Sequence, residues 1–151
     1  TYGNALSSQT DDLLDLTGIG RVLALTSNDE VNALVSLKFA NLFEQANVFQ
    51  LAPIRGEGEP LGIARAMGGR LLFGESATFR ALGQAFGNGT EIKITDLTPE
   101  FDSMDYQAFY NGEAQVLFAI DKAHKLLVNT VDAPLKLHEG MSVISLVPEQ
   151  A

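Results

Sequence analysis

A short polar turn, residues 26–28, is the part of this sequence best placed to bind a ligand. It follows an uninterrupted apolar run, residues 22–25, and precedes a long segment with helical spacing. Hydroxyl groups and the first amides of a helix are groups that can hold a ribose or a phosphate. The carboxyl ends of parallel strands are also where sheets of this type bind ligands. Thr26, Ser27 and Asn28 are therefore candidate ligand-binding residues.

The other polar residues show no catalytic constellation. Gly18 and Gly20 end a predicted helix and precede a strand, whereas a dinucleotide fingerprint follows a strand and opens a helix. His124 and His138 fall in predicted turns with no cysteine to support a metal site. Clustered carboxylates can hold a hard cation, but the cluster here lacks EF-hand spacing; its members are Asp96, Glu100 and Asp102. The sequence predicts neither an enzyme nor a metal site.

The turn is expected to lie inside a crossover unit of a parallel sheet, residues 21–52. The apolar run before it is typical of a strand covered on both faces. Ser27 and Glu30 have the spacing of a capping box, which predicts the start of a helix after the turn. Apolar residues then recur at helical spacing as far as Glu44. Residues 48–51 are predicted to form the second strand.

The chain beyond residue 52 changes character at Thr90, where a second lobe is predicted to begin. The expected elements are a helix at 61–67, a strand at 70–73, a helix at 77–86 capped by Ser76, a strand at 90–97, a helix at 104–110 capped by Ser103, a hairpin of strands 114–120 and 125–130, and a last strand at 141–147. The predicted fold class is α/β, with a partial Rossmann-like parallel-sheet lobe at residues 1–88 followed by a small α+β lobe at residues 89–151.

Composition narrows the classes of partner. The formal net charge of −9 disfavours nucleic acid, because phosphate neutralisation supplies most of that affinity, and it disfavours an anionic membrane surface. No apolar run approaches the ~20 residues that span a bilayer, so we expect no direct insertion into a membrane. The chain has no cysteine, which excludes disulfides and thiolate metal sites and fits a reducing compartment.

Several segments together resemble one family. They are GNA at residues 3–5, GIGRVLALTSNDEVN at 18–32, VFQLAP at 48–53, the long segment at 68–109 that begins GGRLLFGES, and LLVNTVDAPLKLHEGMSVISLV at 126–147. The chain resembles the C-terminal cytosolic regulatory region of bacterial sodium(cation)/proton antiporters. That region is a regulator-of-potassium-conductance (RCK, or TrkA-like) domain, a nucleotide-sensing module of cation transport proteins.

The resemblance implies a site, a cofactor and partners. In the family, the turn equivalent to residues 26–28 faces the nucleotide and the turn at residues 3–5 lies beside its base, so Gly3, Asn4 and Ala5 become candidate cofactor-binding residues. The implied cofactor of a full-length protein is an adenine nucleotide or NAD. The family's glycine-rich loop and ribose-binding acidic residue lie upstream of Thr1, so we expect no cofactor in this chain alone. The implied location is the cytoplasmic side of the inner (plasma) membrane, with the membrane transport domain of the same polypeptide as partner.

The expected function is regulatory, with transport gated by rearrangement of a homodimer. One alternative is a fragment of a nucleotide-dependent oxidoreductase. That activity would need a His, Tyr or Lys facing the cofactor, and Lys38 and Tyr2 are not well placed for it. Another alternative is a purely structural dimerisation module that binds no small ligand. Size-exclusion mass with and without nucleotide separates this module from the regulatory function.

Two surfaces are predicted to need a partner. The apolar stripe at residues 31–43 is wider than one sheet face requires, so it is a candidate pairing surface for a homodimer. The sheet edge near Tyr2 and Arg21 is expected to be covered by another copy, by a swapped segment or by residues 61–73. A dense apolar segment at the predicted helix 104–110 is expected to be mostly core of the second lobe with some exposed positions; its members are Phe101, Met104, Tyr106, Phe109 and Tyr110.

Overall fold

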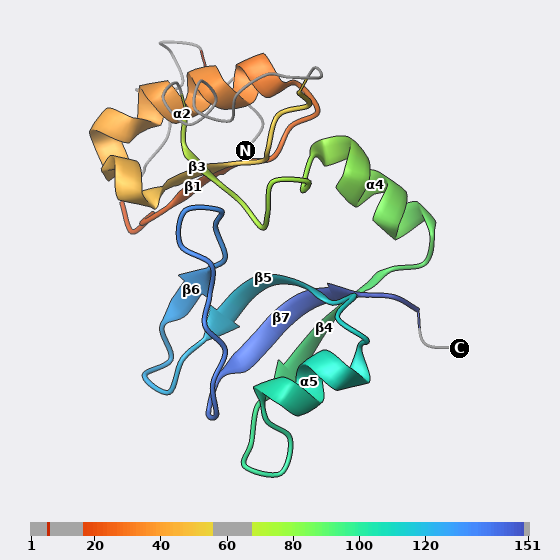
Figure 1. The fold of residues 1–151 in the computed structure, drawn as a ribbon. Helices are drawn as coiled ribbons and strands as arrows, with labels where there is room; N and C mark the ends of the chain where they lie inside the picture. The colour runs from red at the N-terminus through yellow and green to blue at the C-terminus, as the bar shows by residue number, and fades with distance from the viewer. Residues whose placement is uncertain (1–5, 7–16, 56–67, 150–151) are drawn as a thin grey trace. The chain divides into compact units, whose positions relative to one another are not determined.

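The computed structural model describes residue 6 and residues 17–55 and 68–149. The chain divides into two compact units, Thr1–Leu71 (unit 1) and Leu72–Ala151 (unit 2). The predicted turn at residues 3–5 and the predicted helix at 61–67 lie outside the described residues. Unit 1 holds a parallel sheet and unit 2 an antiparallel sheet, which confirms the mixed α/β class (Figure 1).

Unit 1 contains the predicted crossover unit. β1 (Val22–Ala24) pairs in parallel with β2 (Val48–Gln50), and α2 (Asp29–Phe43) connects them and packs on the sheet (Figure 1). All three residues of β2 are buried, as expected of a strand covered on both faces. In β1 only Ala24 is buried, and Leu25 just beyond it is 44% exposed. Coverage on both faces is therefore confirmed for β2 and wrong for most of β1.

The start of α2 differs from the predicted capping box of Ser27 and Glu30. The N-cap is Asn28, whose side-chain oxygen accepts a hydrogen bond from the amide of Val31 at 3.0 Å. The Thr26 hydroxyl accepts from the amide of Asn28, and the first helical residue is Asp29. Asparagine is a residue type favoured at the N-cap. The helix ends at Phe43 and leads through a short 3-10 helix, η1 (Gln45–Asn47), into β2.

β3 (Arg70–Leu71) pairs in parallel with β2 and is shorter than the predicted strand 70–73. The buried side chain of Gln50 accepts a hydrogen bond from the amide of Gly69 at 2.9 Å. A Cβ on Gly69 would lie 2.8 Å from the carbonyl oxygen of Val48, so only glycine fits this close approach. β3 lies on the side of β2 away from β1, so Arg70 and Leu71 do not cover the β1 edge. The other predicted covers of that edge, a second copy or a swapped segment, stay predictions.

Unit 2 contains a four-stranded antiparallel sheet with order β4-β7-β5-β6. Its strands are β4 (Glu91–Asp96), β5 (Gln115–Ile120), β6 (Leu126–Val128) and β7 (Ser142–Val147). The predicted hairpin is confirmed as β5 and β6. Its turn is held by Asp121, whose carboxylate accepts hydrogen bonds from the amides of Ala123 and Lys125, each at 2.9 Å.

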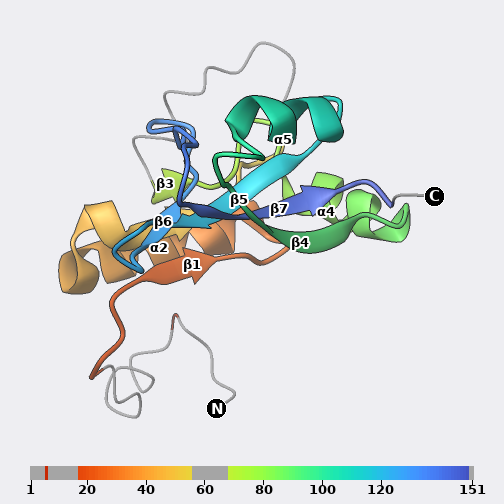
Figure 2. The same ribbon diagram turned by 90° about the horizontal axis from the view of Figure 1, so that it is seen from below.

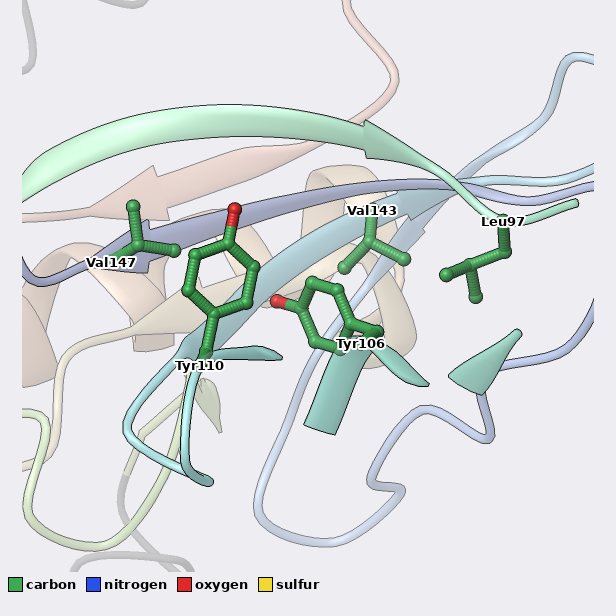
Figure 3. Close-up of a cluster of buried hydrophobic side chains, with 5 residues drawn as sticks. All are labelled: Leu97, Tyr106, Tyr110, Val143 and Val147. Carbon is green, nitrogen blue, oxygen red and sulfur yellow. The ribbon is translucent and has the colours of Figure 1, made fainter. Parts of the chain in front are cut away.

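One face of this sheet is covered by α5 (Ser103–Phe109), as Figure 2 shows. The buried hydroxyl of Tyr106 donates a hydrogen bond to the side chain of Ser145 on β7 at 2.7 Å. Around it lies the core of unit 2, in which the two tyrosine rings face the sheet (Figure 3); its buried members are Leu97, Tyr106, Tyr110, Val143 and Val147. The expectation of a mostly buried aromatic segment is thus met by Tyr106 and Tyr110, whereas Met104 and Phe109 are 78% and 54% exposed.

Two more predicted helix caps were wrong by one or two residues. α5 is capped by Asp102 and not by Ser103, because the Asp102 carboxylate accepts from the amides of Met104 and Asp105 and completes a capping box. The helix predicted at 77–86 is α4 (Phe79–Gly87), and its cap is Thr78 in place of Ser76. The observed caps, Asp102 and Thr78, and the predicted ones, Ser103 and Ser76, are all residue types favoured at an N-cap. Residue type alone therefore does not decide which neighbour caps the helix.

Candidate functional site

The candidate site is the turn between β1 and α2, and a buried asparagine closes it. Asn32, 1% exposed, donates from its side-chain nitrogen to the carbonyl oxygen of Thr26 at 2.9 Å. Its side-chain oxygen lies 3.0 Å from the amide of Thr26 and 2.7 Å from the Thr26 hydroxyl, and accepts from both. Three hydrogen bonds from one side chain therefore hold the chain where it leaves β1.

The polar side chains of the turn divide into those that build it and those that face outward. The Thr26 hydroxyl accepts from the amide of Asn28 at 3.2 Å, and the Asn28 side chain caps α2. Ser27 is exposed, and in the described residues its side chain has no hydrogen-bond partner. Ser27 is thus the turn residue with a hydroxyl available to a ligand, and Thr26 and Asn28 position it.

The charge at this turn is negative. Asp29 and Glu30 occupy the first turn of α2, and no Lys or Arg occurs from Val22 to Leu37. The Asp29 carboxylate accepts from the amide of Ile54 at 2.9 Å, which joins the helix start to the segment after β2. The helix N-terminus favours an anion, but two carboxylates offset that field. The turn therefore suits a hydroxyl-bearing group such as a ribose better than a phosphate.

The structure brings three of the six predicted site residues together. Thr26, Ser27 and Asn28 lie on the surface at the carboxyl end of a parallel strand, as predicted. The other three lie outside the described residues: Gly3, Asn4 and Ala5. Sequence reasoning missed Asn32, although a signal was present. An amide side chain within an otherwise apolar helical face is unfavourable unless it hydrogen-bonds outside the helix.

The other candidate sites hold no metal set or catalytic group. No group of three or more His, Cys, Asp or Glu that could bind a metal occurs among the described residues. Asp96 is hydrogen-bonded to Ser142, and Asp102 is the cap of α5. His124 lies in a turn with a positive φ of 60°, and the ring of His138 contacts the carbonyl oxygen of Lys136 at 3.1 Å. Structural contacts thus account for Asp96, Asp102 and His138.

Unit 2 also carries an open groove of about 900 Å³. Serine and glutamine side chains line it beside Phe73, Met104 and Leu135, and Glu113 is the one charged residue in the lining. Recognition of a phosphate requires cations or a cluster of free amides, and the lining offers no cation. Neither the groove nor the turn of unit 1 complements the phosphates of a nucleotide. The turn remains the better candidate because it lies at the carboxyl end of a parallel strand, where sheets of this type bind ligands.

Comparison with known proteins finds similar solved structures only. No protein-family model matches the chain, and no curated protein does. The chain is similar to a crystal structure of the GsuK RCK domain, with 17% identity and a TM-score of 0.39. It is also similar to the GsuK channel bound to NAD, with 16% identity and a TM-score of 0.40. The alignments cover 98% and 99% of this chain but 34% and 29% of those chains.

The chain thus spans about a third of the length of the proteins it matches. Within the part of the chain that the structure describes, no helix is long and apolar enough to cross a membrane.

Proposed function

We propose that this chain is a ligand-sensing regulatory domain of the RCK type. In this proposal it lies on the cytoplasmic side of the membrane, attached to the transport domain of a monovalent cation:proton antiporter. The observation that carries the proposal is the exposed turn at residues 26–28, held by Asn32 at the carboxyl end of a parallel strand. The family-like segments of the sequence, including the turn itself, support the same assignment.

The proposed ligand is an adenine nucleotide or NAD, with its ribose at the turn. The Ser27 hydroxyl can donate to or accept from a ribose hydroxyl, and the carboxylate of Glu30, in the first turn of α2, can accept from one. No Lys or Arg occurs from Val22 to Leu37 to hold the phosphates. The proposed mechanism is conformational. A ligand that binds one arrangement of a dimer more tightly than another shifts the population toward it, and an attached transporter responds to that shift.

The proposed pairing surface is the outer face of α2. Leu34, Leu37 and Leu42 are 52%, 46% and 59% exposed, while Val35 and Phe39 face the sheet. A helix that keeps three leucines outside its own core has apolar surface available for a second copy. This observation also supports the second candidate function, a structural dimerisation module without a ligand.

Isothermal titration calorimetry with NAD, ADP and adenosine tests the ligand. Unlike the expectation from the family resemblance, this proposal predicts that the chain itself binds. Adenosine should bind within about tenfold of ADP, because the proposed contact of the turn is with the ribose and not the phosphates. Ser27→Leu fills the space above the turn without removing the cap, so it should weaken binding at least about tenfold. Gln45→Leu is the matched control. Gln45 is exposed and lies in η1, before β2, whereas the turn follows the carboxyl end of β1.

The results separate the candidate functions. Binding that Ser27→Leu abolishes and Gln45→Leu leaves unchanged supports the sensing function. Absence of binding by all three compounds overturns it. A dimer mass by size exclusion that does not change with nucleotide would then favour the structural module.

A further inference from the structure

The unpaired edge of β4 carries a pattern that a second copy of the same strand can complement. β4 is the terminal strand in the order β4-β7-β5-β6, and in the described chain it pairs only with β7. A strand edge presents amides and carbonyls that are available to another strand. Beside this edge, Ile92 and Ile94 are 56% and 67% exposed, which is unusual for two isoleucines of one strand.

The two faces of β4 differ in chemistry. Lys93 pairs with Ser145 of β7 and so lies on the face that α5 covers, together with Glu91. Ile92 and Ile94 lie on the opposite face, because successive side chains alternate. Glu91 and Lys93 contact each other at 3.8 Å, with side chains 57% and 38% exposed, so both remain available to a partner.

We propose that β4 pairs with β4 of a second copy, antiparallel, with Ile92 opposite Ile92. Residues directly opposite each other lie on the same face of the sheet. Odd-numbered residues of one copy must therefore lie opposite odd-numbered residues of the other, and even-numbered opposite even-numbered. Centring on Lys93 places two lysines opposite each other, and centring on Ile94 places Lys93 opposite Thr95. Centring on Ile92 alone places each Glu91 opposite a Lys93 of the other copy.

The occupant is therefore a second copy of this chain, selected by charge. A central lysine in an edge strand opposes pairing with most strands, since its charge would be left without a partner. In the Ile92 register each Lys93 lies opposite Glu91 of the other copy, which gives one such pair on each side of the two-fold axis. The exposed Ile92 side chains of the two copies become buried against each other. The result is one continuous eight-stranded sheet, with an α5 on the same face in each half. This inference does not depend on nucleotide binding.

Cysteine cross-linking of the whole chain tests the register. The chain has no native cysteine, so a single introduced cysteine can form a disulfide only between copies. Opposite residues in an antiparallel pair are about 4.5–5.5 Å apart between Cα atoms, which suits a disulfide. Ile92→Cys should therefore form a covalent dimer under mild oxidation. Ile94→Cys is the matched control, because its two copies would lie four residues, or about 13 Å, out of register.

A charge exchange in the Ile92→Cys background tests the complementarity. Glu91→Lys and Lys93→Glu each place like charges opposite each other, so each alone should cross-link about tenfold more slowly, which corresponds to about 1.4 kcal/mol. A mixture of the two variants places Lys opposite Glu at both positions. Its heterodimer should cross-link at the rate of the parent.

Cross-linking by Ile94→Cys that equals or exceeds that of Ile92→Cys would overturn the proposal. So would charge variants that cross-link alone as fast as the parent, or a mixture no faster than either variant. Circular dichroism of each variant controls for folding, and these exposed positions are expected to leave it unchanged.

Discussion

Unit 1 and unit 2 hold their sheets together by different means. The strands of unit 1 are three, three and two residues long, whereas three of the four strands of unit 2 have six. Short parallel strands form few ladder hydrogen bonds, so unit 1 relies on buried amide side chains, Asn32 and Gln50, to fix where the chain turns and pairs. Both units have an apolar core, and unit 2 adds long antiparallel ladders. The comparison indicates that specific polar contacts replace ladder length in the sheet that carries the candidate site.

The largest effect expected in unit 1 comes from truncating its core. Phe39 is 5% exposed and packs with Val35, Val48 and Ala24, so Phe39→Ala should lower the free energy of unfolding by about 3–5 kcal/mol. Leu42→Ala on the same helix is the control, because a side chain 59% exposed should change stability by about 0.5 kcal/mol or less. Urea unfolding followed by circular dichroism measures both. Equal losses would contradict the assigned faces of α2.

A glycine pair tests the tight pairing of β3 with β2. Gly69→Ala forces a Cβ against the backbone of Val48 and should destabilise by about 1–3 kcal/mol. Gly83→Ala in α4 meets nothing within 4 Å and should stabilise by about 1 kcal/mol, because alanine favours a helix. Thermal unfolding of both variants measures the opposite signs. A neutral Gly69→Ala would show that the approach of β3 to β2 is looser than described.

The buried hydrogen bond of unit 2 offers the matching test of a polar contact. Tyr106→Phe leaves the Ser145 hydroxyl without its partner in the core and should cost about 1–2 kcal/mol. Adding Ser145→Ala removes that unpaired group, so the double variant should lose less than the sum of the two single losses. Chemical denaturation of the four proteins gives the coupling. Additive losses would mean that the bond contributes nothing specific.

The same tyrosine predicts a pH dependence. Burial raises the pKa of Tyr106 above the usual 10.0, and this outweighs the hydrogen bond to Ser145, which lowers it. The unfolded chain therefore releases this proton at a lower pH than the folded one. Stability from Tyr106 should be fully present below about pH 10 and should be lost as the pH rises through the folded-state pKa. Tyr106→Phe should show a shallower loss of stability above pH 10 than the parent.

The smallest effect distinguishes the observed helix cap from the predicted one. Asp102→Ala removes hydrogen bonds to the amides of Met104 and Asp105 and should cost about 1 kcal/mol. Ser103→Ala should stay within about 0.5 kcal/mol, because Ser103 is the first helical residue and not the cap. Thermal unfolding compares the two. A larger loss in Ser103→Ala would restore the cap predicted from the sequence.

Much of the architecture was predictable because it is local. The crossover unit and the β5–β6 hairpin follow from apolar periodicity and turn residues, which act over a few positions. The caps were harder, since adjacent residues of suitable type competed at each helix start. Thr78 and Asp102 took the role in place of Ser76 and Ser103. A hydrogen bond to a particular amide decides between neighbours, and composition does not contain that geometry.

The candidate site shows the same division. The sequence by itself determined that a polar turn follows an apolar strand and that residues 26–28 stand at its end. Only the tertiary structure decided that Asn32 closes the turn, that Gln50 meets Gly69 from 19 residues away, and that β4 is left at an edge with two exposed isoleucines. The physical reason is distance along the sequence. Local periodicity reports which face of a helix or strand is buried. The pairing of backbone and side-chain groups far apart in sequence depends on where the folded chain brings them together.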